Sequence, residues 1–560
     1  MVYVYAKQSE INYYVGKKLS VQEIEDTLIN IGMDLKGISE EKDPELKIEI
    51  TAEKLDLIST VGISRAIKFY LGLVKEVPKY ELTKSNLEIN VNKNVIETRP
   101  KIVAAILKNV PMSQKFLDEM IKIQEKIHDS FGRGRKKAAI GIYPLDKISF
   151  PISYSSEDPN TIVFKPLEHD TELNGFEILN QHDTGKKFAH LLKDLKSFPV
   201  LRDNKNKVLS MPPIINSHEM GRVEIIHKDL FVEVTGYNEN HLDNILKVLI
   251  TTFIEMGASA QSIKINYSND VSYELNLDNS FETISLEDTN KLIGVKIKSD
   301  DVEKLLSKMM FGLKSIRGDK LEVEIPVFKS DIWFDVDITD DLARAYGYNN
   351  IIPKFPNIST VGNKLEISDF KDKISNQLVS MGFLELYTYM LSSTKLHFDN
   401  LNLDYKEENF IKLIDSTDQG INMIRTMILP DNLESLRINR KNKYPQKIFE
   451  NGWTIQSDNS KDTKARNEAH LSVSIAGPQV NYTEIKTIID TLAKLNNFKF
   501  VFKEVSLPYL IEGRGAEVYF NDKKVGFIGE LSPNILNNFS LLVPVISFEI
   551  NLDLIFSLLN

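Results

Sequence analysis

The chain has 560 residues, a formal net charge of −10 and no cysteine. One hydrophobic core does not organise a chain of this length, so three or four domains are expected, and the lack of cysteine excludes disulfides and cysteine-ligated zinc. The composition (42% hydrophobic, 26% charged), with no apolar run long enough to cross a bilayer, indicates a cytoplasmic globular protein without a membrane partner. Because the net charge is negative, contacts with nucleic acid must come from local basic patches or a partner chain.

Residues 1–80 are predicted to form a small α/β module. Apolar residues at helical spacing predict a helix over 22–31. Asp56 and Arg65 are interpreted as a surface ion pair, which contributes ~0–1 kcal/mol. The polar stretch 84–94 is interpreted as a linker to the next domain.

Residues 95–270 are predicted to form a second domain that carries a basic loop. A helix predicted over 116–127 is followed by Gly132 to Lys137, which contains two glycines and four basic residues. The loop lacks the glycine spacing and the Lys-Ser/Thr ending of a nucleotide phosphate-binding loop. It is either a solvated hairpin, which the pattern alone favours, or a loop that approaches phosphates or a sugar edge.

A strand predicted over 231–236 has an unusual face. Its alternation places Phe231, Glu233 and Thr235 on one side and two valines on the other. An acid and a hydroxyl beside an aromatic ring are typical of a pocket wall. A sheet face exposed to water gives the same pattern, so both interpretations stay open.

Residues 274–356 contain an acidic segment. A strand over 321–325 is followed by a predicted helix with Asp337 as its N-cap and Gly347 as its end. Four carboxylates lie in this region: Asp331, Asp337, Asp340 and Asp341. They are either part of a well-capped acidic helix start, with Arg344 as the partner of Asp340, or ligands of a hard divalent cation such as Mg²⁺.

Residues 360–560 are predicted to form the last domain. Apolar residues between 367 and 381 recur at helical spacing, so the domain begins with an amphipathic helix. Three apolar segments follow, at 423–430, 447–452 and 525–533.

Taken in chain order, these segments resemble the β subunit of phenylalanyl-tRNA synthetase in its archaeal and eukaryotic form, from about residue 10 onwards. The string from Phe328 to Pro353 is similar to the family's B5 segment, residues 185–236 look like its B3/B4 editing domain, and the three apolar segments look like its B6/B7 segment. The resemblance implies a multidomain α+β fold. Its parts would be the editing domain, the B5 domain, and a C-terminal class II synthetase-like antiparallel sheet domain that lacks catalytic residues.

The resemblance also implies site residues. The editing pocket would contain Leu201, Ser210, Glu233 and Thr235, with Glu233 recognising a tyrosine hydroxyl. His128 and Arg135 are further candidates for holding the tRNA end or a water. Mg²⁺ would be bound by Asp331, Asp337, Asp340 and Asp341 together with the α subunit. The chain departs from the family at the last two aspartates, where glutamates are usual, at Lys329, where arginine is usual, and at Glu53-Lys54-Leu55, where Asn-Arg-Pro is usual.

The function that the resemblance implies is attachment of phenylalanine to tRNA(Phe) by an α2β2 heterotetramer, with ATP consumed on the α chain. The β chain would hydrolyse mischarged tyrosyl-tRNA, because an apolar pocket rejects an added hydroxyl by only roughly 10²-fold. Two alternatives stay open: a non-catalytic tRNA-binding scaffold whose editing has decayed, and a stand-alone RNA-binding protein without an α partner.

Overall fold

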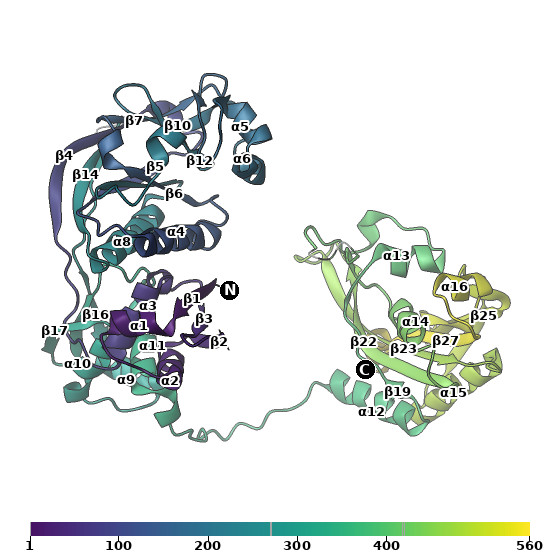
Figure 1. Cartoon of the computed structure of the whole chain (residues 1–560). Helices are drawn as coiled ribbons and strands as arrows, with labels where there is room; N and C mark the ends of the chain where they lie inside the picture. The colour runs from purple at the N-terminus through teal and green to yellow at the C-terminus, as the bar shows by residue number, and fades with distance from the viewer. Residues whose placement is uncertain (1, 269–270, 417, 419) are drawn as a thin grey trace. The chain divides into compact units, whose positions relative to one another are not determined.

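The computed structural model describes residues 2–268, 271–416, 418 and 420–560. They form two compact units, Met1–Phe355 (unit 1) and Pro356–Asn560 (unit 2). Both units combine sheets with helices (Figure 1), so the predicted multidomain α+β fold is confirmed at this level.

Unit 1 begins with a small antiparallel sheet of order β1-β3-β2. Its strands are β1 (Val2–Lys7), β2 (Asp34–Ile38) and β3 (Glu45–Ile50), and its helices are α1 (Gln8–Val15), α2 (Val21–Ile31) and α3 (Thr60–Tyr70), with the short 3-10 helix η1 (Leu55–Leu57) between β3 and α3. The predicted helix over 22–31 is therefore confirmed as α2. Ser20 and Glu23 form a capping box at its start, which satisfies backbone N–H groups that the helix leaves unpaired.

The centre of unit 1 is a large mixed sheet of order β12-β11-β10-β7-β4-β14-β5-β13-β6, with β15 paired to β14. Its strands are β4 (Leu82–Val91), β5 (Lys101–Lys108), β6 (Ala138–Pro144), β7 (Ile152–Glu157), β10 (Phe198–Arg202), β11 (Val208–Met211), β12 (Ile215–Asn216), β13 (Leu230–Gly236), β14 (Ser259–Tyr267) and β15 (Ser272–Tyr273). Helices α4 (Gln114–Asp129) and α8 (Glu239–Glu255) pack on one face (Figure 1), and the helices α5 (Gly175–Gln181), α6 (Asp183–Phe188) and α7 (His218–Gly221) and the small β8–β9 pair (Val163–Phe164, Leu173–Asn174) complete this region.

The interpretation of residues 84–94 as a linker is wrong. Residues 82–91 form β4, which pairs in parallel with β14 on one side and β7 on the other. The polar side chains of β4 lie on the side open to solvent, while Ile89 and Val91 enter a hydrophobic cluster. A strand with one wet face has a linker-like composition, and only its non-local pairing identifies it.

The acidic segment lies in a region with a β16-β18-β17 sheet. Its elements are β16 (Ser280–Ser285), α9 (Leu286–Ile293), α10 (Ser299–Lys308), β17 (Gly312–Arg317), β18 (Lys320–Ile325) and α11 (Asp335–Tyr346). Helix α11 ends at Gly347, as predicted, where φ is +93°. The N-cap prediction is wrong: Phe334 is the N-cap, and Asp337 reaches back from the first turn to accept hydrogen bonds from the N–H groups of Trp333 (2.7 Å) and Phe334 (2.8 Å).

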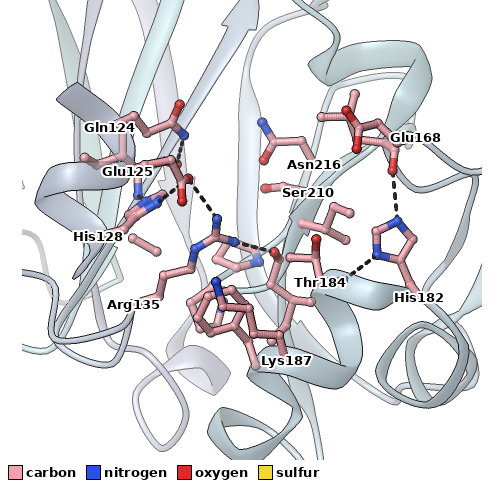
Figure 2. Close-up of a pocket in the computed structure, with 18 of the residues that line it drawn as sticks. Gln124, Glu125, His128, Arg135, Glu168, His182, Thr184, Lys187, Ser210 and Asn216 are labelled. Carbon is pink, nitrogen blue, oxygen red and sulfur yellow. Dashed lines mark hydrogen bonds and ion pairs between the residues drawn. The ribbon is translucent and has the colours of Figure 1, made fainter. Parts of the chain in front are cut away.

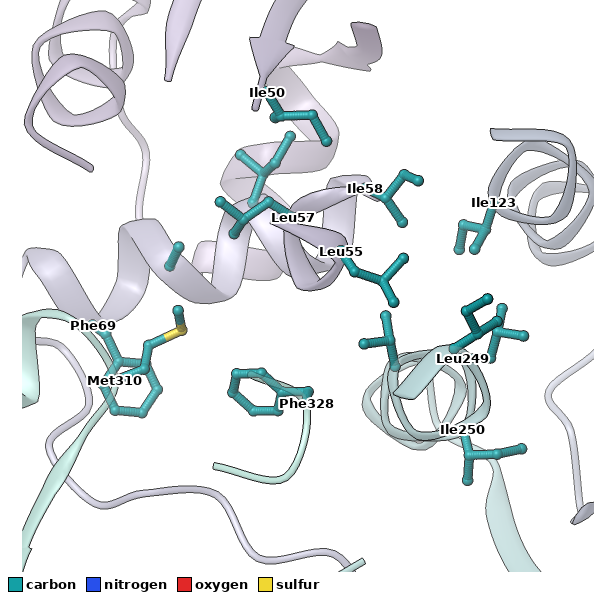
Figure 3. Packing of buried hydrophobic residues seen from close by; sticks show 14 of the residues in the cluster. Ile50, Leu55, Leu57, Ile58, Phe69, Ile123, Leu249, Ile250, Met310 and Phe328 are labelled. Carbon is teal, nitrogen blue, oxygen red and sulfur yellow. The ribbon is translucent and has the colours of Figure 1, made fainter. Parts of the chain in front are cut away.

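One hydrophobic core joins these parts of unit 1. Figure 3 shows Leu55 of the N-terminal module, Leu249 of α8 and Phe328 of the acidic region, which belong to one cluster of buried side chains. Arg65 lies at this junction, so its interpretation as a surface ion-pair partner of Asp56 is wrong. Its guanidinium is buried, stacks on the Phe328 ring at 3.6 Å and pairs with Glu255 at 3.0 Å. Sequence proximity suggested Asp56, but packing of α3 against other modules decides the partner.

Unit 2 is a sheet of order β19-β22-β23-β27-β26-β25-β24, antiparallel except for the β19–β22 pair. Its strands are β19 (Leu384–Glu385), β22 (Gln446–Ser457), β23 (Ala465–Ala476), β24 (Phe500–Glu504), β25 (Leu510–Phe520), β26 (Lys523–Leu531) and β27 (Val545–Asn551), with a β20–β21 pair (Leu391–Ser392, Met423–Ile424). The helices are α12 (Glu366–Ser380), α13 (Thr394–His397), α14 (Leu429–Ile438), α15 (Tyr482–Asn496), α16 (Pro533–Asn538) and α17 (Leu552–Leu559). The predicted first helix is α12, which buries Ile374 and Leu378.

Candidate functional site

A cavity of about 470 Å³ lies beside β13 and is called the β13 cavity here. Figure 2 shows side chains from α4, from the basic loop and from the segment around His182 facing it. Its polar lining comes from Gln124, Glu125, His128, Arg135, Glu168, His182, Thr184, Lys187, Ser210, Asn216 and Glu233. An apolar lining from residues such as Phe188 and Ile214 completes a space suited to an aromatic side chain.

Glu233 is the buried acid of the cavity. It lies on β13 opposite Ala104 of β5 and Gly141 of β6, where a Cβ at Gly141 would lie 2.3 Å from Glu233 Oε1. Burial raises the pKa of Glu233 to about 8. At neutral pH the group is therefore mainly a carboxylic acid, which can donate one hydrogen bond as well as accept. Its Oε2 atom has no hydrogen-bond partner among the described residues.

Tyr143 connects Glu233 to Ser210. Its hydroxyl lies 3.0 Å from Glu233 Oε1 and 2.8 Å from Ser210 Oγ. A phenol has one proton, so it donates to one partner and accepts from the other. Burial raises the pKa of Tyr143 well above its ordinary value, so it stays protonated. This arrangement occupies Oε1 and leaves Oε2 of Glu233 as the free polar atom. Tyr143 was not among the sequence candidates, and no local pattern identifies it.

Leu201 and Thr235 do not line the β13 cavity. Leu201 lies opposite Ser210 in the β10–β11 pair, but its side chain is part of a hydrophobic cluster. Thr235 Oγ1 accepts a hydrogen bond from Arg99 Nε at 3.0 Å. The structure thus brings Ser210 and Glu233 together in the cavity lining, whereas Leu201 packs in a hydrophobic cluster and Thr235 bonds to Arg99.

His128 and Arg135 both lie at the cavity and both contact Glu125. His128 Nδ1 lies 3.2 Å from Glu125 Oε1, and His128 Nε2 accepts the Ile140 N–H at 2.8 Å. Nε2 is therefore unprotonated, and burial lowers the pKa of His128, so it is a neutral imidazole with both nitrogens in use. The hydrogen bond from His128 and the charge of Arg135 lower the pKa of Glu125 to about 2.

Arg135 presents a cation to the cavity. Its Nη2 lies 3.1 Å from Glu125 Oε1, its Nη1 donates to the Ile214 carbonyl at 2.9 Å, and its guanidinium lies 4.4 Å from the Phe188 ring centroid. The Nε–H is buried and has no partner among the described residues. Arg135 can therefore bind an oxygen of a ligand. Both nitrogens of His128, by contrast, are used in contacts within the protein.

Arg99 positions the basic loop and was missed by the sequence analysis. This fully buried guanidinium donates to the Thr235 carbonyl at 2.6 Å and to the carbonyls of Arg135 and Lys136, both at 3.3 Å. It therefore ties the loop to β13. An arginine in a stretch of mixed composition carries no local signal for this role, because its partners lie far away in the chain.

The raised pKa of Glu233 predicts a pH-dependent stability. The folded chain keeps a proton that the unfolded chain releases above its ordinary pKa of 4.5, so wild-type stability falls as pH rises from 4.5 to about 8 and levels off beyond. The full effect is on the order of 3–5 kcal/mol relative to Glu233→Gln, which does not titrate. Denaturant unfolding of both proteins at a series of pH values measures it. Parallel stability curves for the two proteins would contradict the prediction.

The four aspartates of the acidic segment separate into different environments. Asp331 and Asp341 are buried next to Lys54 and Lys329, Asp337 caps α11, and Asp340 pairs with Arg344 at 2.8 Å, as predicted. Within the described ranges, no three acidic or histidine side chains are grouped so that they could hold a metal ion. The donor set does not fit Mg²⁺, because the two buried carboxylates already face ammonium groups.

The whole chain is similar to proteins whose function is known. It is 34% identical over 97% of both chains to the phenylalanine–tRNA ligase β subunit of Pyrococcus horikoshii, and 31% identical over 95% of both to that of Archaeoglobus fulgidus. The chain belongs to the phenylalanine–tRNA ligase β-subunit family. The resemblance read from its sequence is therefore confirmed. Proteins of this family are subunits of an aminoacyl-tRNA synthetase.

Two domain models and a solved structure support the assignment to the β-subunit family. Residues 282–348 match the tRNA synthetase B5 domain, and residues 351–552 match the phenylalanyl-tRNA synthetase β-chain CLM domain. A crystal structure of an N-terminal fragment of the Pyrococcus horikoshii β subunit superposes with a TM-score of 0.59 and 34% identity, covering 62% of this chain and 100% of the fragment. Among the helices in the described ranges, none has the length and apolarity needed to span a membrane.

Proposed function

We propose that this chain is the β subunit of an α2β2 phenylalanine–tRNA ligase and that its β13 cavity hydrolyses tyrosine wrongly attached to tRNA(Phe). The observation that carries the editing role is Glu233, a buried acid that lines the cavity and whose Oε2 has no hydrogen-bond partner among the described residues. A buried polar atom left unpaired costs roughly 1–3 kcal/mol. A ligand hydroxyl at this atom removes that cost, and an apolar ring edge does not.

Selection of tyrosine over phenylalanine follows from this difference. The tyrosine hydroxyl can accept the Glu233 proton or donate to the carboxyl, whereas phenylalanine leaves Oε2 unpaired. Sites built to hydrogen-bond a hydroxyl reject the analogue without it by roughly 10⁴–10⁵-fold, far more than an apolar pocket achieves by shape. The cavity therefore favours tyrosine over phenylalanine, which is the distinction that an apolar phenylalanine site makes poorly.

Hydrolysis in the cavity needs a positioned water rather than a side-chain nucleophile. Water adds to the ester carbonyl, the bond to the ribose oxygen breaks, and the proton passes to that oxygen. His128 has no free nitrogen for this step, because one accepts from Ile140 and the other faces Glu125. The terminal ribose hydroxyl of the tRNA can share the proton, and Arg135 is placed to hold the tRNA end.

The ATP-dependent step and its Mg²⁺ are assigned to the α subunit. In unit 2, two buried acids of the sheet are already engaged: Glu450 lies 2.7 Å from Arg425 Nη2, and Glu549 lies 2.8 Å from His470 Nδ1 and accepts the N–H groups of Ile428 and Leu429. This supports a class II synthetase-like domain without catalytic residues. Several large apolar side chains are exposed, among them Trp333 (78%) and Tyr387 (91%). Such exposure supports the proposal that a partner chain covers them.

The test uses the purified α/β complex with tRNA(Phe) that carries either tyrosine or phenylalanine. The complex is expected to release tyrosine much faster than phenylalanine, and the β chain alone is expected to charge neither amino acid. If the complex charges phenylalanine but leaves tyrosyl-tRNA intact, the β chain is a tRNA-binding scaffold whose editing activity has decayed. Failure of the chain to associate with an α subunit would remove the whole proposal.

A further inference from the structure

Two lysines face the buried aspartates that the family resemblance assigned to Mg²⁺. Lys54 Nζ lies 2.5 Å from Asp331 Oδ2 and 3.5 Å from Asp341 Oδ1, and Lys329 Nζ lies 2.7 Å from Asp341 Oδ2. The four side chains are buried, with exposed fractions of 12% for Lys54, 3% for Lys329, 7% for Asp331 and 1% for Asp341. They are called the lysine–aspartate cluster below.

The other two aspartates are engaged elsewhere. Asp337 accepts two backbone hydrogen bonds at the start of α11, and Asp340 binds Arg344 and receives a hydrogen bond from the Tyr348 hydroxyl at 3.0 Å. Neither has a hydrogen bond or ion pair to the cluster among the described contacts. Asp337 uses only its Oδ2 atom in these bonds, whereas both oxygens of Asp340 are engaged, so a shared four-carboxylate site would require Asp340 to leave its partners.

The charge of the cluster decides against a divalent ion. The ammonium groups of Lys54 and Lys329 face the carboxylates of Asp331 and Asp341. A third buried acid, Asp56, interacts with Asp331, both lysines and the guanidinium of Arg65, and burial raises its pKa. Among the described residues, Asp331 Oδ1 and Asp341 Oδ1 lack hydrogen bonds, which by itself would favour a cation. A dication added there would bring two uncompensated charges into a buried site beside two ammonium groups, which is strongly unfavourable. Mg²⁺ also gives up its waters reluctantly and needs near-octahedral oxygen ligands.

We propose that the ammonium groups of Lys54 and Lys329 take the place of a divalent cation at Asp331 and Asp341. Lys54 follows β3 of the N-terminal module, and Asp331 lies 277 residues later, before α11. The cluster thus joins the two regions without a metal. The shared hydrophobic core also joins them. The ammonium of Lys329 lies 4.4 Å from the centroid of the Phe311 ring, which stabilises the cluster further. This inference concerns binding and stability, so it is tested separately from editing.

The first experiment counts bound metal on the α/β complex without ATP. Mn²⁺ serves as the probe, read by electron paramagnetic resonance. Wild type and Asp341→Asn are expected to bind the same number of Mn²⁺ ions, because Asp341 holds no metal. If wild type binds one more ion per β chain than Asp341→Asn, the proposal is overturned.

The second experiment removes one cation from the joint. Lys54→Met leaves two buried carboxylates with one ammonium group, so its melting temperature in EDTA is expected to fall by roughly 5–15 °C. The wild-type melting temperature is expected to be the same in EDTA and in Mg²⁺. Lys84→Met is the matched control: its ammonium is exposed and pairs with Glu274 at 3.6 Å, and the variant is expected to melt like wild type. Destabilisation of wild type by EDTA, or a Lys54→Met protein as stable as wild type, would contradict the proposal. If Lys54→Met does not fold, the melting temperatures of wild type in EDTA and in Mg²⁺ still test the proposal.

Discussion

Replacing Glu233 with alanine is expected to slow release of tyrosine from tyrosyl-tRNA(Phe) by at least about 10²-fold, while charging of phenylalanine is unchanged. The variant removes the only carboxyl that lines the cavity from β13, and the tyrosine hydroxyl then enters a site without its partner. Single-turnover deacylation by the α/β complex measures the effect.

Two matched variants separate recognition from stability. Glu233→Gln keeps a donor and an acceptor at the same position, so it is expected to retain most of the preference for tyrosine over phenylalanine. Glu239→Ala removes a partly exposed carboxylate that pairs with Lys101 outside the cavity, so its deacylation rate is expected to equal that of wild type. A Glu233→Ala complex with the full wild-type rate would show that Glu233 has no part in recognising tyrosine.

Replacing Arg425 with methionine is expected to destabilise unit 2 by about 3–5 kcal/mol, because it leaves buried charge without a partner. Arg425 is 1% exposed and Glu450 is fully buried, and their charged atoms lie 2.7 Å apart. Arg425 also donates to the Trp453 carbonyl at 2.8 Å and to Thr388 Oγ1 at 2.7 Å. Arg425 Nη1 also pairs with the buried Asp431 at 3.4 Å, so one substitution breaks two ion pairs and two hydrogen bonds together.

Denaturant unfolding reports on this change through tryptophan fluorescence. The chain has two tryptophans, so a Trp333→Phe background leaves Trp453, next to Arg425, as the probe. The double variant Arg425→Met/Glu450→Gln is expected to be more stable than Arg425→Met alone, since it removes the fully buried charge of Glu450 that the single variant leaves unpaired. Arg437→Met, which breaks an exposed pair with Glu434, is expected to cost less than about 1 kcal/mol. Equal stabilities of Arg425→Met and Arg437→Met would refute the argument.

Local patterns were sufficient for several elements of the fold. The alternation in residues 231–236 placed Glu233 beside Phe231 on one face, and the structure buries that face, which removes the interpretation of a sheet face exposed to water. The end of α11 at Gly347 and the apolar stripe of α12 were predicted for the same reason. Such features depend on backbone geometry over a few residues, which the sequence expresses directly.

The partners of buried charged residues could not be predicted from local sequence patterns. Arg65 forms its ion pair with Glu255 and donates only to the backbone carbonyl of Asp56, and Arg99 was not recognised as the residue that ties the basic loop to β13. Both partnerships join residues far apart in the chain. A charged side chain looks the same in sequence whether it stands in water or in a core, because burial is a property of packing.

By itself, the sequence determined the family, the order of the segments along the chain and the acid on β13, since these depend on residue type and spacing. The tertiary structure decided that Tyr143 occupies one oxygen of Glu233, that Thr235 faces Arg99, and that Lys54 meets Asp331. The physical reason is that hydrogen bonds and ion pairs form between side chains close in space, and folding alone sets those distances.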